Sequence, residues 1–315
     1  MFDLPEKVTI VEVGPRDGLQ NESTPIATPV KLAYIQKLVD AGLTQIEATS
    51  FVHPKAVPQL ADAAEVARNL PRAVDVIFSA LVPNLHGLKR AIESGFRRVA
   101  VFTAASDSFT QKNIGMSIEE SLSVFAEVVR EAIANGMTVR GYVSTAFVCP
   151  YEGLVSKDRV RELTDRLLQM GVDEVAVSDT IGAAAPKEVT ETIAHLLRTV
   201  PRESIALHFH DTYGTALANV LVGLQMGITT FDSSTGGMGG CPFAPGAAGN
   251  LATEDLVYML HRMDIQTGVN PDKLIEAGAV ISQALGRPLR SAQWRMRNVT
   301  CAVNNGEYKT NISGA

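Results

Sequence analysis

Short runs rich in β-branched residues recur along this chain, and each is followed by a segment with helical spacing of its apolar residues. The runs are VTIVEV, QIEATSF, DVIFSALV, RVAVFTAA, TVRGYVSTAF, EVAVSDT, SIALHFHDT and TTFDSSTGG. Helical segments such as residues 28–42, 117–136 and 156–171 lie between them, with Ser or Thr starts and Gly ends as helix caps require. Strict alternation needs parallel strands with right-handed crossovers. Repeated units of about 30 residues then favour a closed (β/α)8 barrel, the TIM barrel.

A doubly wound open sheet also alternates strands and helices, and it is the competing fold. That fold carries a G-x-G-x-x-G turn after its first strand when it binds a dinucleotide, but here the first strand runs into EVGPRDGLQNE. We therefore expect one catalytic domain over residues 1–286, an α/β TIM barrel followed by the extra C-terminal helical segment NPDKLIEAGAVISQALG. The polar tail, residues 287–315, has weak periodicity and is left unassigned.

Charge and composition exclude several classes of partner. The 315 residues carry a formal net charge of −6 with a pI near 5.6, whereas a nucleic-acid-binding face is basic. No stretch reaches the ~18 apolar residues of a membrane span, and the N-terminus lacks a signal-like apolar run. Cys149, Cys241 and Cys301 are too irregularly spaced for a disulfide framework or a metal knuckle. We expect a cytoplasmic protein with reduced thiols that binds neither nucleic acid nor membrane.

In a TIM barrel the catalytic groups lie at the carboxyl ends of the strands, and polar side chains stand at these ends here. The catalytic candidates are Arg16, Glu47, Asp179, His208, His210 and Cys241. The substrate-binding candidates are Arg16, Arg140, Tyr142 and Ser144. Simpler explanations exist for several of them: Arg16 and Asp17 can form an exposed P-R-D-G turn, and Glu47 or Asp179 can be solvated.

The seventh predicted strand ends in His-Phe-His-Asp. Because side chains alternate between the two faces of a strand, His208 and His210 share one face. With a carboxylate and the amide oxygen of Asn250, they make a mixed nitrogen and oxygen set that suits Mg²⁺ or Mn²⁺ better than a thiolate zinc site would. A lone His at a strand end is usually a hydrogen-bonded structural group, so the pair alone leaves the metal open.

A glycine-rich loop, STGGMGGCPFAPGAAGN, follows the eighth predicted strand and carries Cys241. Cysteine is more often a small buried hydrophobe than a catalyst, but the flanking glycines make a packing role less natural. The glycines can equally cradle a phosphate. Lys112 is a candidate contact for an anionic ligand, although we favour a solvated loop lysine.

Several stretches carry a resemblance to a known family. They are VEVGPRDGLQNE, IEATSFVHPKAVPQ, RGYVSTAFVCPYEG, SDTIG, HFHDTYGTALANVL and GGMGGCPFAPGAAGNLATEDLVYML, spanning roughly residues 8–286. They are long and non-repetitive. In them the chain resembles the 3-hydroxy-3-methylglutaryl-CoA lyases, a family of the DRE-type metal-dependent barrel superfamily.

The resemblance implies a site and a reaction. The implied ligands of a divalent cation, Mg²⁺ or Mn²⁺, are Asp17, His208, His210 and Asn250. Arg16 is implied to support an enolate, and Cys241 is implied to donate a proton from a mobile loop. The implied reaction is retro-Claisen cleavage of a 3-hydroxy-acyl-CoA thioester into acetyl-CoA and a 3-keto acid, acetoacetate in the type case, by a homodimer. The general base stays open among Asp17, His208 and His210.

The chain departs from these lyases in the loop, where they have S-V-A-G-L-G-G-C-P-Y and it has STGGMGGCPF. Gly236 in place of Ala is expected to loosen the backbone, and Phe243 lacks a phenolic hydroxyl, so substrate choice is in question. A lyase for a longer 3-hydroxy-3-alkylglutaryl-CoA, a related aldolase and a Claisen synthase therefore stay open. A silent barrel that only binds a ligand is the alternative from another class, and the intact polar set argues against it.

Overall fold

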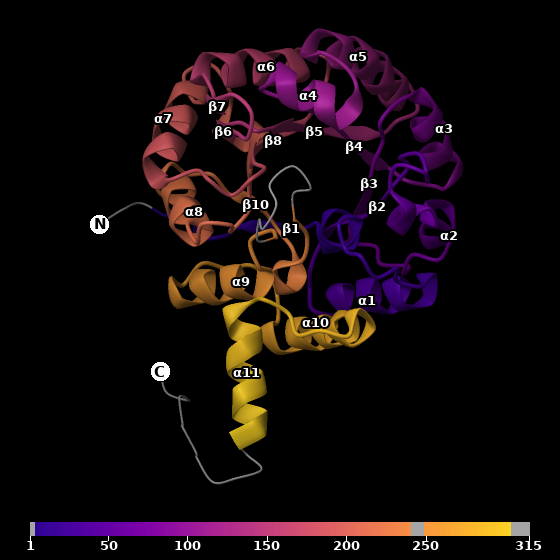
Figure 1. Cartoon of the computed structure of the whole chain (residues 1–315), viewed down its shortest axis with the longest axis vertical. Helices are drawn as coiled ribbons and strands as arrows, with labels where there is room; N and C mark the ends of the chain where they lie inside the picture. Colours follow the sequence, from indigo (N-terminus) through magenta and orange to yellow (C-terminus); the bar gives the residue numbers. More distant parts are fainter. Residues whose placement is uncertain (1–3, 241–248, 304–315) are drawn as a thin grey trace.

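The computed structural model describes residues 4–240 and 249–303, with side chains up to residue 297. Eight parallel strands close into a barrel in the order β1-β10-β9-β8-β5-β4-β3-β2 (Figure 1). The strands are β1 (Thr9–Glu12), β2 (Gln45–Ser50), β3 (Ile77–Leu81), β4 (Arg98–Ala104), β5 (Thr138–Ser144), β8 (Glu174–Asp179), β9 (Ile205–Phe209) and β10 (Thr230–Ser233). Each lies within one of the predicted strand segments, so the (β/α)8 barrel is confirmed.

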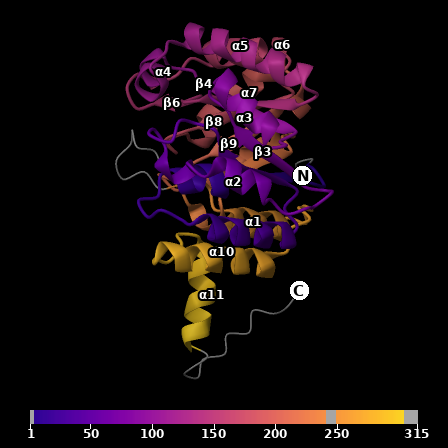
Figure 2. The same ribbon diagram turned by 90° about the vertical axis from the view of Figure 1, so that its right-hand side faces the viewer.

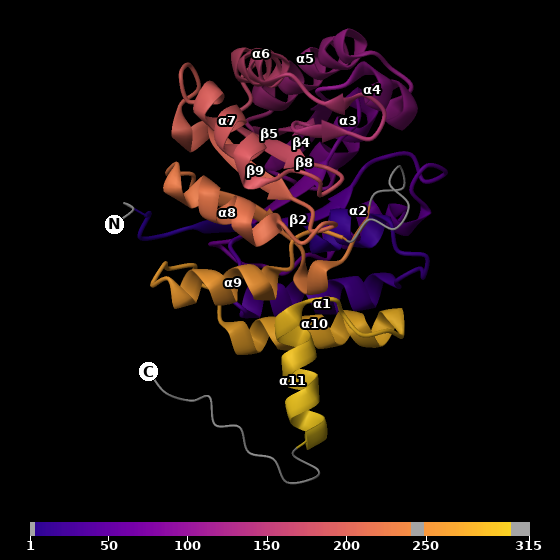
Figure 3. The same cartoon turned by 60° about the vertical axis from the view of Figure 1, so that its left-hand side comes forward.

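Helices cover the outside of the barrel (Figures 1 and 3). They are α1 (Thr28–Asp40), α2 (Ala63–Arg68), α3 (Leu85–Glu93), α5 (Ile118–Ala134), α6 (Lys157–Gln169), α7 (Pro186–Leu196), α8 (Ala216–Gln225) and α9 (Thr253–Arg262). Helix α5 begins at a capping box, in which the side chains of Ser117 and Glu120 each accept a hydrogen bond from the other residue's backbone N–H. A continuous apolar core, including Ile35, Val128 and Leu207, lies between the helices and the strands.

Two insertions interrupt the alternation beyond the carboxyl ends of the strands. Helix α4 (Asp107–Ile114) stands between β4 and α5, and a hairpin of β6 (Val148–Cys149) and β7 (Gly153–Leu154) stands between β5 and α6. Strand β5 ends before the predicted limit of residue 147 because Thr145, with φ of 50°, turns the backbone away from the strand. Short helical turns are η1 (Gly14–Gly18), η2 (Pro58–Leu60), η3 (Arg202–Ser204) and η4 (Thr235–Gly237).

Two helices follow the barrel. Helix α10 (Pro271–Leu285) is the expected extra segment and packs against α1 and α9. Helix α11 (Ala292–Val303) occupies part of the tail that the sequence left unassigned, and it projects away from the barrel (Figure 2). Leu289 and Trp294, just before and at the start of α11, are buried and belong to the same apolar core as the barrel helices.

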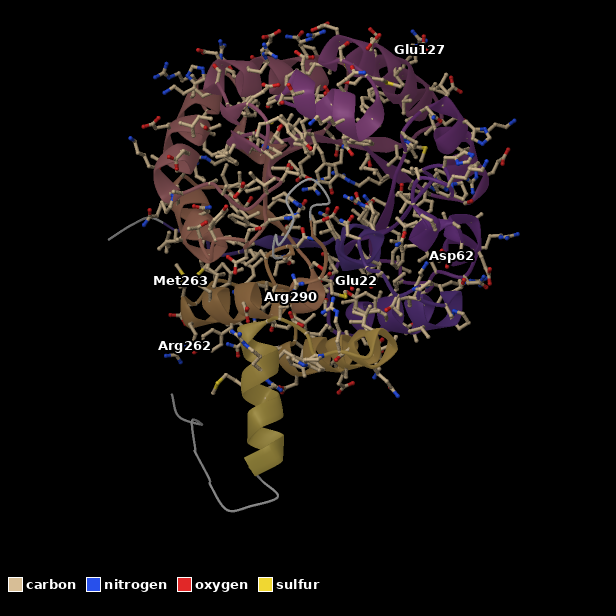
Figure 4. All side chains as sticks on the ribbon, in the orientation of Figure 1. Glu22, Asp62, Glu127, Arg262, Met263 and Arg290 are labelled. Carbon is tan, nitrogen blue, oxygen red and sulfur yellow. The ribbon has the colours of Figure 1, made fainter. Side chains whose placement is uncertain are left out.

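Side chains fill the interior of the ring of strands, so the barrel is packed and is not a pore (Figure 4). Charged and polar side chains, among them Glu47, Arg140 and Asp232, are buried in this interior. Among residues 4–240 and 249–303, no helix is both long and apolar enough to span a bilayer.

Candidate active site

A pocket of ≈ 580 Å³ lies at the carboxyl ends of the barrel strands. Its polar wall residues include Arg16, Asp17, Gln20, Tyr142, Ser144, Ser178, Thr180, His208 and His210. Its apolar wall includes Val52, Leu81, Phe102 and Ile114, and the last of these comes from α4. A cavity that combines convergent polar groups with an apolar wall is typical of a small-molecule site.

Asp17, His208 and His210 meet in this pocket. One potential ligand atom from each lies within 4.8 Å of the others. Asp17 is brought there by turn η1, in which its backbone N–H donates to the carbonyl of Val13 at 2.7 Å. The two imidazole centroids are 5.2 Å apart, and Nε2 of His210 is 3.7 Å from Oδ2 of Asp17.

The charge states of Asp17 and His210 suit a cation. Burial alone would raise the pKa of Asp17, but the adjacent Arg16 guanidinium and the nearby His210 imidazole hold it well below its usual range. Burial lowers the pKa of His210, against the opposing effect of Asp17. An ionised carboxylate and neutral imidazoles are the forms that bind metal ions.

Asn250 completes this group. It forms an antiparallel bridge with His210, and its Nδ2 donates to Oδ2 of Asp17 at 2.8 Å and to the carbonyl of Met238 at 3.0 Å. Its Oδ1 is buried without a hydrogen-bond partner among the described residues, as is Nδ1 of His210. A buried amide oxygen without a partner is costly unless something absent from the protein chain pairs with it. The donor set therefore fits a hard divalent cation.

Arg16 lies beside this group and is 7% exposed. Its Nη1 donates to Oδ1 of Asp17 at 2.6 Å and its Nε donates to Glu47. Burial would lower the pKa of Arg16, but the carboxylates of Glu47 and Asp17 raise it above its ordinary value. The guanidinium therefore stays charged while its position is fixed from two sides.

Glu47 supports Arg16 from within the barrel. One carboxylate oxygen accepts from Arg16 and the other accepts from the Tyr142 hydroxyl at 3.1 Å. Glu47 is 1% exposed and stands behind the pocket wall, whereas Tyr142 and Ser144 line the pocket as a substrate contact would.

The structure does not bring Arg140 and Asp179 to the pocket wall. Arg140 shares the inward face of β5 with Tyr142 but lies two residues nearer the amino end, where its guanidinium is paired with Asp232 and Glu174. Asp179 faces the opposite way from its neighbour Ser178, and its carboxylate accepts from the backbone N–H groups of Ala183 and Ala184. Burial raises the pKa of Asp179 to about 6 against these hydrogen bonds.

Sequence reasoning missed several residues near the site. Asp232 on β10 accepts a hydrogen bond from Nδ1 of His208 at 3.1 Å, and Ser178, Thr180 and Gln20 line the pocket. A signal for Asp232 was available, because an acidic residue inside a strand of a closed barrel has to find a buried partner.

Cys241 lies outside the described residues. The residue before it, Gly240, lines the pocket, and its carbonyl accepts a hydrogen bond from Nδ2 of Asn21 at 2.8 Å. The described chain therefore reaches the pocket wall one residue before Cys241.

Comparisons with known proteins agree on one family. The HMGL-like family model matches residues 7–281. "Hydroxymethylglutaryl-CoA lyase, mitochondrial" of Bos taurus is 52% identical over 299 residues, which cover 95% of this chain and 91% of that protein.

Solved structures give the same result. The crystal structure of hydroxymethylglutaryl-CoA lyase from Pseudomonas aeruginosa superposes with a TM-score of 0.92 at 46% identity, covering 94% of this chain and 99% of that one. An HMG-CoA lyase from Acinetobacter baumannii, solved with coenzyme A and 3-methylmalate, has a TM-score of 0.89 at 36% identity over 100% of both chains. With its fold, its donor cluster and these relatives, the chain belongs to the HMGL-like family, together with the hydroxymethylglutaryl-CoA lyases.

Proposed function

We propose that this protein is a carbon–carbon lyase that cleaves 3-hydroxy-3-methylglutaryl-CoA into acetyl-CoA and acetoacetate. The observation that carries the proposal is the cluster of Asp17, His208 and His210 beside the charged Arg16 in one pocket. Coenzyme A bound to the Acinetobacter baumannii relative supports an acyl-CoA thioester as the substrate class.

The site residues would hold a divalent cation, which we propose to be Mg²⁺ or Mn²⁺. Its ligands would be Asp17, His208, His210 and Asn250, of which Asn250 offers the buried Oδ1. Oxygen and imidazole ligands suit these ions. When bound, the cation supplies Lewis acidity that orients the tertiary hydroxyl and the carboxylate of the substrate and makes the hydroxyl more acidic.

The protein's own groups account for the remaining chemistry. The proton of the tertiary hydroxyl leaves to a basic atom of Asp17, His208 or His210, and the hydroxyl carbon becomes the carbonyl of acetoacetate. The electron pair of the broken carbon–carbon bond moves into the thioester, which becomes an enolate with its charge on oxygen. The Arg16 guanidinium, fixed in place by Glu47 and Asp17, stabilises that charge in a site shielded by Leu81 and Phe102.

The enolate carbon finally needs a proton, and we propose that the Cys241 thiol donates it. A neutral thiol is a competent acid near pH 7. Cys241→Ser is expected to keep the melting temperature and the bound metal but lose most of kcat, because a hydroxyl is a far weaker acid. A packed thiol would give the reverse, a lower melting temperature with nearly normal kcat, and that result would remove Cys241 from the mechanism.

Substrate length is the second part of the proposal. A panel of 3-hydroxy-3-alkylglutaryl-CoA thioesters, with the 3-methyl compound as the reference, tests it through the rate of acetyl-CoA release. The highest kcat/KM is expected for the 3-methyl compound. Faster cleavage of a longer alkyl homologue would assign the protein to that substrate, and release from none of them would overturn the lyase proposal.

We also propose a homodimer in a reducing, cytoplasmic compartment. Family resemblance supports the dimer, and the three irregularly spaced cysteines support the reducing compartment. The Bos taurus relative is named as mitochondrial. Sedimentation of the purified protein tests the dimer.

A further inference from the structure

A line of charged side chains runs through the barrel interior toward the active site. Arg98 pairs with Asp173 at 2.8 Å and approaches Glu174 at 3.4 Å, and Glu174 pairs with Arg140 at 2.7 Å. The interiors of such barrels are usually filled by branched apolar residues, which are less costly to bury. This arrangement therefore calls for a role other than filling space.

Arg140 and Asp232 form the part of this line that lies nearest the active site. Nη2 of Arg140 donates to Oδ1 of Asp232 at 2.7 Å, and Nη1 donates to Oδ2 at 3.0 Å. The exposed fractions of the two residues are 2% and 1%, and neither of them lines the pocket. A bidentate guanidinium–carboxylate pair fixes the orientation of the carboxylate plane.

The same carboxylate reaches the candidate metal site. Oδ2 of Asp232 lies 3.1 Å from Nδ1 of His208. A carboxylate paired with a guanidinium only accepts hydrogen bonds, so Nδ1 of His208 must carry the proton. Nε2 is then left with its lone pair, on the side of the ring away from Asp232, and His208 also lines the pocket.

We propose that Arg140 and Asp232 act as a positioning pair, which holds His208 in the Nδ1-protonated tautomer with Nε2 as its metal-binding atom. His208 then has no free lone pair, and Asp17 and His210 are left as the candidates for the general base. This inference rests on the proposed metal site. It gives Arg140 a role through Asp232 in place of the direct substrate contact expected from sequence. Arg140 also donates to the Tyr142 hydroxyl at 3.0 Å, and Tyr142 donates to Glu47, the partner of Arg16. The guanidinium thus supports both the metal ligand and the catalytic cation.

Asp232→Asn tests the pair with little change of shape. An asparagine has one acceptor oxygen, and its NH₂ group would face either Arg140 or His208. If the NH₂ group faces His208, Nδ1 must accept and the ring proton moves to Nε2, which can no longer bind a metal. If the NH₂ group faces Arg140, it opposes an N–H donor of the guanidinium, and the two-bond pairing that fixes the orientation of residue 232 is lost. Either outcome weakens metal binding.

The first measurement is the Mn²⁺ dissociation constant of the metal-free protein, by electron paramagnetic resonance. Asp232→Asn is expected to raise it about 10- to 100-fold, the usual effect of removing a group that orients a metal ligand. Arg98→Gln is the matched control, since it removes a charge from the same line at a residue that does not contact Asp232. It is expected to leave Mn²⁺ affinity unchanged. Equal affinities for Asp232→Asn and wild type, or equal losses for both variants, would overturn the positioning role.

The second measurement needs only the wild-type protein, so it stands if Asp232→Asn does not fold. ¹⁵N spectra of protein labelled at its 6 histidines, with His208 assigned by its absence in His208→Asn, report which nitrogen carries the proton. Protonated Nδ1 and bare Nε2 are expected in the metal-free protein. A proton on Nε2 would contradict the inference. Failure of the wild-type protein to bind Mn²⁺ would instead overturn the proposed metal site itself, and the two failures are thereby distinguished.

Discussion

Arg16 is the charged group that the proposed chemistry uses in the transition state. Arg16→Gln is expected to lower kcat on the order of 10²-fold or more, because a neutral amide stabilises an enolate oxygen far less than a guanidinium does. Metal content should stay near that of the wild type, because the proposed ligands are unchanged. The measurements are kcat and metal content.

Arg166→Gln is the control for this prediction. It removes an arginine that pairs with Glu119 through two hydrogen bonds of 2.5 and 2.7 Å on the outside of the barrel. Its kcat should equal that of the wild type. A large fall in metal content of the Arg16 variant, with the remaining metal-loaded fraction fully active, would reassign Arg16 to assembly of the site.

The position of a site residue was predictable from sequence where the alternation of side chains along a strand assigned it to one face. The H-x-H spacing puts His208 and His210 on one face, and the structure has them together in the pocket. The sequence does not show which face of the strand at Asp179 points inward, and the structure has Ser178 facing the pocket instead. The sequence also does not show how far Arg140 lies below the pocket. Residues 140 and 142 share one face of the strand, and only the closed barrel decides which of them lines the pocket.

At the scale of elements, turn η4 is held more tightly than its glycines suggest. Gly236 is buried, its N–H donates to Glu254 at 2.8 Å, and its carbonyl accepts from the backbone of Arg290 at 3.0 Å. These contacts fix one conformation of the turn, and the loosening expected from Gly in place of Ala stays a prediction. The missing methyl group instead leaves room for Leu289, which a Cβ at residue 236 would approach to 2.6 Å.

Gly236→Ala is expected to reduce the free energy of unfolding by more than the backbone strain of a positive φ angle alone would. Gly236 has φ of 68°, which costs a non-glycine residue about 1 kcal/mol, and the contact with Leu289 adds to this. Gly95→Ala is the control, since Gly95 has φ of 87° but no described atom within 4 Å of its Cβ position. Denaturant unfolding of both variants isolates the contact. Equal losses would show that Leu289 moves aside freely.

Glu254, which holds this turn, makes the stability of the protein depend on pH. Burial raises its pKa from 4.5 to about 8, against the hydrogen bond from Gly236 and with a contribution from Glu12. The folded state binds the proton of Glu254 more tightly than the unfolded state does. The contribution of this proton to the free energy of unfolding is therefore complete below pH 4.5 and is lost as pH rises to about 8.

Glu254→Gln should remove this dependence while keeping an oxygen that accepts from Gly236. The free energy of unfolding is measured from pH 5 to 9, a range that spans the titration of Glu254. As pH rises, it should fall less steeply for the variant than for the wild-type protein. The difference in slope should approach about 1.4 kcal/mol per pH unit. Parallel curves for the two proteins would show that Glu254 does not titrate in this range.

Some elements could not be predicted from local pattern. Helix α4 carries Lys112, which the sequence predicted to lie in a loop, and the sequence predicted no strand at β6 or β7. Each of these elements is short and follows a strand end whose polar residues resemble a turn. Helix α11 carries a polar sequence, and the burial of Trp294 against the barrel helices is a long-range contact that no local period reports. These are the parts whose structure depends on tertiary packing.

At the scale of the whole molecule, the alternation of strands and helices predicted parallel strands, and the lack of a G-x-G-x-x-G turn after the first strand favoured the closed barrel over an open sheet, as the structure confirms. The site followed from it, because closure brings the carboxyl ends of distant strands to one pocket. Asp17 and Asn250, 233 residues apart in the sequence, are joined by a hydrogen bond of 2.8 Å. The identity of the cation and the length of the substrate's alkyl group are set by the site and not by the fold.

The most direct test of the account is the release of acetyl-CoA from 3-hydroxy-3-methylglutaryl-CoA by protein stripped of metal with a chelator, before and after Mg²⁺ or Mn²⁺ is restored. We predict no turnover in the stripped protein. With the cation restored, we predict acetyl-CoA and acetoacetate in equal amounts. Full turnover in a preparation shown by elemental analysis to lack metal, or no acetyl-CoA from the metal-loaded protein, would contradict the account.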